Sequence, residues 1–103
     1  MDLLECRNKL DVIDKQIVKL FEERMHICGK VAETKIATGK AVYDAEREKQ
    51  KLEAVSAMAG SDFNQIAVRE LFSQMMSISR KYQYSILAEH GRSAKLGFRT
   101  GPE

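Results

Sequence analysis

An unbroken helical pattern from Leu3 to Ile36 constrains the fold of this chain more than any other feature. The segment has no proline, and its only glycine is Gly29. Its apolar residues recur at the spacing of one helix face: Leu10, Ile13, Ile17, Leu20, Ile27 and Val31. A helix of this length spans about 50 Å at ~1.5 Å per residue, more than a monomeric globule of 103 residues covers. We therefore predict that a second chain packs along it.

Two shorter helices follow, separated by segments that lose the helical pattern. Residues 37–40 combine a glycine with a loss of periodicity, which indicates a loop. Asp44 has the side chain of an N-cap and predicts a helix from Ala45 to about Met58. Residues 59–62 break the chain again, and a third helix is expected from about Asn64 to Glu89. The predicted fold class is therefore all-α.

The last part of the chain, residues 91–103, differs in composition from the rest. It holds three glycines, the only proline and three cations, which is typical of a flexible tail or a linker remnant. We expect one domain over residues 1–90, because most domains have ~100–150 residues. The expected architecture is one very long N-terminal helix and two shorter ones, completed by a second copy into an intertwined homodimeric helical bundle.

The composition excludes several classes of protein. With 44% hydrophobic and 31% charged residues, the chain is too apolar to be disordered. No apolar run approaches the ~18 residues of a membrane span, and the N-terminus lacks the basic start and apolar core of a signal peptide. We therefore expect a cytoplasmic protein without a membrane partner. The net charge of +2 and the interleaved acidic and basic residues do not indicate a nucleic-acid partner.

The sequence does not indicate metal or cofactor chemistry. Cys6 and Cys28 are too few for a disulfide framework and have no ligand cluster nearby, so both are expected to be reduced thiols. His26 and His90 have no metal-type partners three or four residues away. No Cys–His or Ser–His pair and no glycine-rich phosphate loop can be assembled from the sequence. We expect no metal and no cofactor.

Two cations lie on the apolar stripe of the first helix. Arg24 comes seven residues after Ile17 and seven before Val31, and Lys35 follows Val31 by four. Both therefore face the same side of the helix, close to three turns apart at ~3.6 residues per turn. A buried cation is costly unless an anionic group meets it. The two cations predict a pocket for a negatively charged ligand.

Polar residues also interrupt the apolar faces of the other helices, as expected for a site inside a helical bundle. The candidate site residues are Arg7, Arg24, Lys35, Asp44, Arg47, Glu48, Ser79 and Gln83. They offer cations for carboxylates or phosphates, and an amide and a hydroxyl for further hydrogen bonds. An enzyme with this set of side chains would work by positioning and electrostatics.

In these residues the chain resembles the AroQ-type chorismate mutases, an all-helical family that rearranges chorismate to prephenate. The resemblance covers residues 4 to about 87. It rests on Arg-Asn-Lys-Leu-Asp-Val-Ile-Asp from Arg7 to Asp14, Leu-Phe-Glu-Glu-Arg ending at Arg24, Val-Ala-Glu-Thr-Lys ending at Lys35, Tyr-Asp-Ala-Glu-Arg-Glu from Tyr43 to Glu48, and Ser79 with Gln83 after Leu71-Phe72. Each segment alone is a weak signal, but their order along the chain makes the resemblance specific.

The resemblance implies a cofactor-free pericyclic rearrangement of a dicarboxylate. Lys35 and Gln83 are implied to donate to the ether oxygen, where negative charge builds as the C–O bond breaks. The resemblance thus implies that they are the catalytic residues, because such contacts would be stronger in the transition state than in the ground state. The implied substrate-binding residues are Arg7, Arg24 and Arg47 around the carboxylates with Ser79 assisting, Glu48 and the backbone near Asp44 at the ring hydroxyl, and Val31 in the apolar wall.

The position of Arg7 predicts how the site is shared. It lies 17 residues before Arg24, or ~25 Å along a continuous helix at ~1.5 Å per residue. A ligand as small as chorismate cannot contact both residues of one chain. If Arg7 belongs to the site, as the resemblance implies, it reaches the pocket of a partner subunit. We expect a two-fold symmetric homodimer with antiparallel first helices and two shared active sites.

Each candidate also has a purely structural explanation. Arg24 could form a buried salt bridge with Glu48, and Lys35 could simply favour the macrodipole at the end of its helix. Ser79 could bond back to its own helix, and Gln83 could face water. Asp44 could serve as an N-cap, and Arg47, at the third position of its helix, could point outward.

Two other functions stay open at this point. One is an isochorismate-pyruvate lyase on the same fold, and the other is a non-catalytic helical dimerisation or regulatory module. The presence of Glu48 and Gln83, and the short loop before Asp44, favour the mutase over the lyase. A dimerisation module would not need cations on a buried stripe. In many bacteria such mutase domains are fused to a prephenate dehydratase or dehydrogenase, and residues 91–103 would then be part of the linker.

Overall fold

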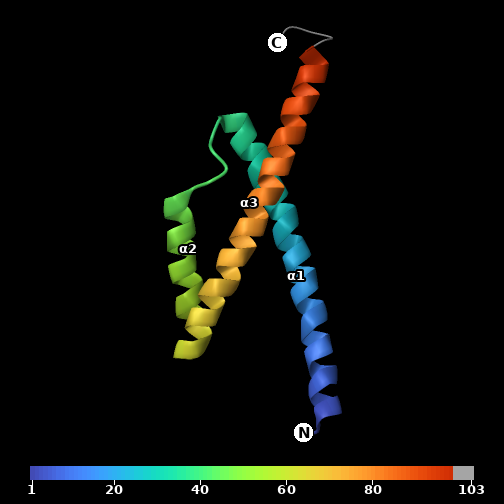
Figure 1. Ribbon diagram of the computed structural model, residues 1–103, viewed down its shortest axis with the longest axis vertical. Helices are drawn as coiled ribbons and strands as arrows, with labels where there is room; N and C mark the ends of the chain where they lie inside the picture. The colour runs from blue at the N-terminus through green and yellow to red at the C-terminus, as the bar shows by residue number, and fades with distance from the viewer. Residues whose placement is uncertain (99–103) are drawn as a thin grey trace.

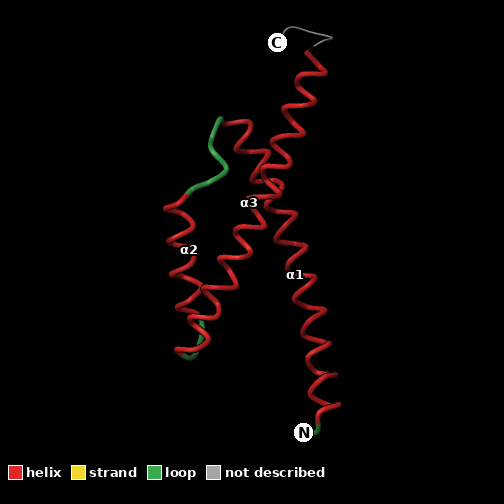
Figure 2. Tube along the Cα trace, in the orientation of Figure 1, coloured by secondary structure: helices red, strands yellow, loops and turns green. Residues whose placement is uncertain are grey.

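The computed structural model describes residues 1–98 as three helices joined by two short connections (Figure 1). α1 covers Leu3–Thr38, α2 covers Ala45–Met58 and α3 covers Asp62–Phe98. No strand occurs among residues 1–98, and Figure 2 shows helix everywhere except in the connections and at the chain start. The predicted all-α class and the three helices are confirmed.

α1 is capped at both ends. The Asp2 carboxylate accepts a hydrogen bond from the backbone N–H of Glu5 at 2.8 Å. Gly39 has the left-handed backbone conformation, with φ at 70°, that commonly ends a helix. Residues 37–38 were predicted as loop but are the last residues of α1. The chain leaves helical geometry only at the glycine, where a positive φ costs little.

The caps of the other two helices follow the same logic. Asp44 caps α2 as predicted, because its side chain accepts a hydrogen bond from the Arg47 backbone N–H at 3.0 Å. The Ser61 hydroxyl accepts one from the backbone N–H of Asn64 at 3.1 Å. Because Ser61 acts as this cap, α3 begins at Asp62, two residues earlier than predicted.

α3 continues beyond its predicted end. The helix runs through Gly91 to Phe98, so the prediction that it ends at about Glu89 is wrong. One glycine in a helix interior costs ~1 kcal/mol and does not by itself end the helix. Residues 99–103, the rest of the predicted tail, lie outside the described residues. Whether residues 91–103 form a tail or a linker stays a prediction.

α3 is the central helix and packs against both α1 and α2. Figure 1 shows α3 crossing the C-terminal part of α1, while the N-terminal half of α1 projects away from the other helices. The chain is accordingly elongated, with extents of 66 × 30 × 14 Å. The crossing brings the C-terminal half of α1 and the start of α2 to neighbouring sides of α3.

The core of the single chain is small, and the projecting half of α1 is not covered. Within residues 1–91, the buried residues are Ala32, Val42, Val55, Met76, Ser79 and Gln83. On the apolar stripe of α1, Ile13 is 49% exposed and Leu20 is 62% exposed. Within residues 1–98, no helix combines the length and the hydropathy needed to cross a membrane.

Candidate active site

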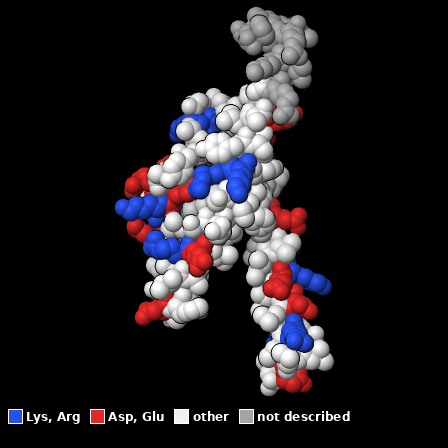
Figure 3. Space-filling model, in the orientation of Figure 1, with Lys and Arg blue, Asp and Glu red and all other residues white. Residues whose placement is uncertain are grey.

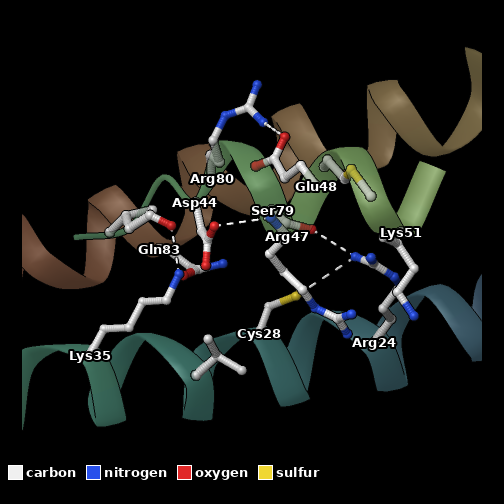
Figure 4. A pocket seen from close by; sticks show the side chains of 13 residues that line it. Arg24, Cys28, Lys35, Asp44, Arg47, Glu48, Lys51, Ser79, Arg80 and Gln83 are labelled. Atoms are coloured by element: carbon white, nitrogen blue, oxygen red, sulfur yellow. Dashed lines mark hydrogen bonds and ion pairs between the residues drawn. The ribbon is translucent and has the colours of Figure 1, made fainter. Parts of the chain in front are cut away.

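A cavity of about 190 Å³ lies between α3, the C-terminal half of α1 and the start of α2 (Figure 4). All three helices and the connection before α2 contribute to its lining: Arg24, Cys28, Val31, Lys35, Val42, Asp44, Arg47, Glu48, Lys51, Met76, Ser79, Arg80 and Gln83. Every residue predicted for the site lines this cavity except Arg7. Arg7 is exposed on the projecting half of α1.

The lining is strongly cationic. Among the described residues, its basic side chains belong to Arg24, Lys35, Arg47, Lys51 and Arg80, and its carboxylates to Asp44 and Glu48. Figure 3 shows Lys and Arg side chains over the region where the helices meet, with Asp and Glu side chains among them. A cleft lined by an excess of one charge attracts ligands of the opposite charge. The cavity therefore suits a small molecule with more than one negative group.

Arg24 is held in place by α3. Its Nη1 donates to the Ser79 hydroxyl at 2.9 Å and lies 3.8 Å from the Cys28 sulfur. Ser79 is buried, and this contact directs its hydroxyl toward Arg24 across the helix interface. The alternative in which Arg24 pairs with Glu48 is not what the structure shows, because Glu48 forms its ion pair with Arg80.

Lys35 occupies the last turn of α1 and points into the cavity. Its ammonium donates to the Val42 carbonyl at 2.6 Å, which ties the connection before α2 to α1. An ammonium carries three donors, so this bond leaves two for a ligand. The cation is therefore both anchored and available.

Gln83 contributes a side-chain amide to the cavity lining and is buried, with 8% of its surface exposed. Among the described residues its Oε1 has no hydrogen-bond partner. The low exposure of Gln83 excludes the alternative in which its side chain faces water. A buried polar atom without a partner costs ~1–3 kcal/mol, so such an atom at a cavity is expected where a ligand or another chain completes the bonding. Figure 4 shows Gln83 beside Lys35 and Asp44.

The start of α2 brings its polar residues to the cavity from one side. The Asp44 carboxylate is occupied by capping the helix, which fixes the backbone at this wall. Arg47 is exposed, yet it lines the cavity, and Figure 4 shows its guanidinium on the same side as that of Arg24. Two guanidinium groups thus lie together at the end of the cavity away from Lys35.

The chain matches the family model described as chorismate mutase type II over residues 6–84. It belongs to this family. The predicted resemblance to the all-helical chorismate mutases is confirmed.

Two relatives of this chorismate mutase family are bifunctional chorismate mutase/prephenate dehydratases. The one from Buchnera aphidicola subsp. Acyrthosiphon pisum is 33% identical over 96 residues, covering 91% of this chain and 25% of the relative. The one from Enterobacter agglomerans is 31% identical over 108 residues, covering 98% of this chain and 27% of the relative. A chorismate mutase of Methanocaldococcus jannaschii is 47% identical over 47 residues, covering 46% and 48%. The chain thus spans about a quarter of the bifunctional relatives' length.

Sequence reasoning missed two cations of the cavity lining, Lys51 and Arg80. Lys51 follows Glu48 by three residues, so helical spacing alone would have placed both on one face. Arg80 gave no such signal, because its position at the cavity depends on how α3 packs against α2. The two residues that it meets there, Tyr43 and Glu48, precede it by more than thirty positions.

Proposed function

We propose that the chain is a chorismate mutase that converts chorismate to prephenate in phenylalanine and tyrosine biosynthesis. The family membership supports this, and so does the cationic cavity. The observation that carries the proposal is that two hydrogen-bond donors, the Lys35 ammonium and the side-chain amide of the buried Gln83, line one cavity.

The excess of cations would bind the two carboxylates of the substrate. Arg24, oriented by Ser79, and Arg47 lie on the same side of the cavity and suit a planar carboxylate. Fixing both ends of the molecule holds the compact conformer in which the two reacting carbons meet. Positioning of this kind removes much of the entropic barrier of a unimolecular rearrangement. Val31 would supply part of the apolar wall.

Lys35 and Gln83 would act on the bond that breaks. As the C–O bond lengthens, negative charge builds on the ether oxygen, and two fixed donors stabilise it more than they stabilise the substrate. No proton needs to move and no covalent intermediate forms. Glu48 and the backbone at Asp44 would accept and fix the ring hydroxyl.

We propose that the working form is a homodimer. The exposed apolar stripe on the projecting half of α1 supports this, because a stable chain does not leave so long a face uncovered. Two α1 helices packed antiparallel would cover it and bring Arg7 of each chain toward the cavity of the other. The cytoplasmic location expected from the sequence belongs to the same proposal.

A turnover assay with product identification tests the proposed activity. The purified chain is incubated with chorismate and, separately, with isochorismate, and products are separated by chromatography. Prephenate from chorismate is the expected result. Salicylate and pyruvate from isochorismate would identify a lyase, and no turnover of either compound by a folded dimer would identify a non-catalytic module.

A further inference from the structure

The roles proposed above leave one strong contact at the cavity unused. Nη1 of Arg80, on α3, donates to Oε1 of Glu48, on α2, and the two form an ion pair. Only 29% of the Arg80 side chain and 23% of the Glu48 side chain are exposed. Partial burial reduces the screening that weakens surface ion pairs, so this pair constrains Glu48 more than an exposed one would.

Arg80 also contacts the connection that precedes α2. Its Cζ lies 5.2 Å from the centroid of the Tyr43 ring, a cation–π distance. One guanidinium therefore touches residues on both sides of Asp44, the cap of α2. The hydrogen bond to Glu48 raises the pKa of Arg80 above its ordinary value, so the guanidinium stays charged wherever the protein is folded.

The Arg80 guanidinium points away from the two guanidinium groups, those of Arg24 and Arg47, that are proposed to bind a substrate carboxylate. Figure 4 shows its guanidinium on the opposite side of the Glu48 carboxylate from Arg24 and Arg47. Arg80 engages Oε1 of Glu48. Since an ionised carboxylate has about four lone-pair sites on two oxygens, Oε2 can still accept a hydrogen bond from a ligand.

Other cations of the cavity would compete for the same carboxylate. Lys51 lies one helical turn after Glu48 on α2, and both residues line the cavity. If Arg80 were absent, Glu48 would be drawn toward Lys51 or Arg47. The Glu48 carboxylate would then turn away from the ring hydroxyl and neutralise a cation that would otherwise bind a carboxylate of the substrate.

We propose that Arg80 is a positioning residue that determines how this site recognises the ring hydroxyl of its substrate. Its ion pair holds Glu48 with one oxygen toward the hydroxyl and keeps that carboxylate away from the cations that bind the substrate carboxylates. This inference rests on the proposed function, because it takes Glu48 to be the partner of the hydroxyl.

The test measures selectivity for the hydroxyl instead of activity alone. Binding of two dicarboxylate analogues of the bicyclic transition state, one with the ring hydroxyl and one without it, is measured by calorimetry. Arg80→Met should weaken the hydroxyl-bearing analogue about tenfold, the cost of a hydrogen bond to a charged group. It should change binding of the other analogue by less than about twofold. Arg69→Met, which removes an exposed cation elsewhere on α3, is the matched control.

A double-mutant cycle shows whether Arg80 acts through Glu48. In a Glu48→Gln background, Arg80→Met should add less than about twofold, because coupled residues are not additive. Equal losses for both analogues, full additivity, or no loss beyond that of Arg69→Met would each overturn the proposal.

A second variant keeps the test decisive if Arg80→Met does not fold. Tyr43→Leu removes the other contact of the guanidinium and should produce a smaller loss confined to the hydroxyl-bearing analogue. An equal loss for both analogues would overturn the proposal here too. A wild-type chain that does not turn over chorismate would refute the proposed function itself. The binding measurements do not depend on turnover, so failure of the proposed function and failure of the role of Arg80 can be told apart.

Discussion

Arg24 on α1 donates a hydrogen bond from Nη1 to the Ser79 hydroxyl on α3 at 2.9 Å. The two residues are 55 positions apart in the chain, so the contact links α1 to α3 and directs the guanidinium toward α3. A guanidinium has five N–H donors, and this bond leaves most of them for a ligand. Ser79 thus orients the Arg24 guanidinium so that its remaining N–H groups can bind a carboxylate.

Replacing Ser79 with alanine should weaken substrate binding more than chemistry. Without the hydroxyl, Arg24 loses its fixed direction, and KM for chorismate should rise about tenfold, the cost of one hydrogen bond to a charged group. The value of kcat should change less. Steady-state kinetics measure both quantities. Ser73→Ala, at an exposed position of α3, is the control, and an unchanged KM in Ser79→Ala would contradict the assigned role.

The amide of Gln83 should make the rate insensitive to pH. An amide donates a hydrogen bond at any ordinary pH, so kcat should be nearly flat between about pH 6 and 8. A carboxyl group at this position donates only when protonated. The Gln83→Glu variant should therefore be more active at about pH 5 than at about pH 8, whereas Gln83→Met should be slow at both. A steep loss of wild-type kcat as pH rises through neutrality would indicate an unrecognised acid.

The shared-site dimer can be tested by mixing inactive chains. In a heterodimer of Arg7→Ala and Lys35→Ala chains, one site combines both lesions and the other is intact, so activity should return after the chains are unfolded together and refolded. A mixture of Lys35→Ala and Gln83→Ala chains is the control, because every site then keeps one lesion. Heterodimers of the first pair that form but stay inactive would refute the shared site, as would a fully active monomer.

Local patterns predicted much of this molecule. Helical spacing placed Arg24 and Lys35 on one face of α1, and the structure brings both to one cavity. The capping preference of Asp44 fixed the start of α2 correctly. Such features depend on neighbours within a few residues, and the sequence shows these directly.

The features that sequence reasoning missed depend on packing or on the absence of a stop signal. The ion pair of Arg80 with Glu48 exists only because α2 lies along α3. α3 was predicted to end near Glu89 because the apolar stripe fades there, but loss of amphipathicity does not end a helix without a breaking residue. Arg7 remains apart from the cavity in the single chain, so its role stays a proposal.

The turnover rate of Lys35→Ala tests the central claim most directly, because that claim assigns the stabilisation of the ether oxygen to fixed donors. Lys30→Ala, which removes an exposed lysine of the same helix, is the control, and circular dichroism checks that both variants fold. We expect kcat for prephenate formation to fall by at least about a hundredfold in Lys35→Ala, the usual cost of losing one such donor, and to stay unchanged in Lys30→Ala. Turnover close to wild type in a folded Lys35→Ala variant would contradict the mechanism.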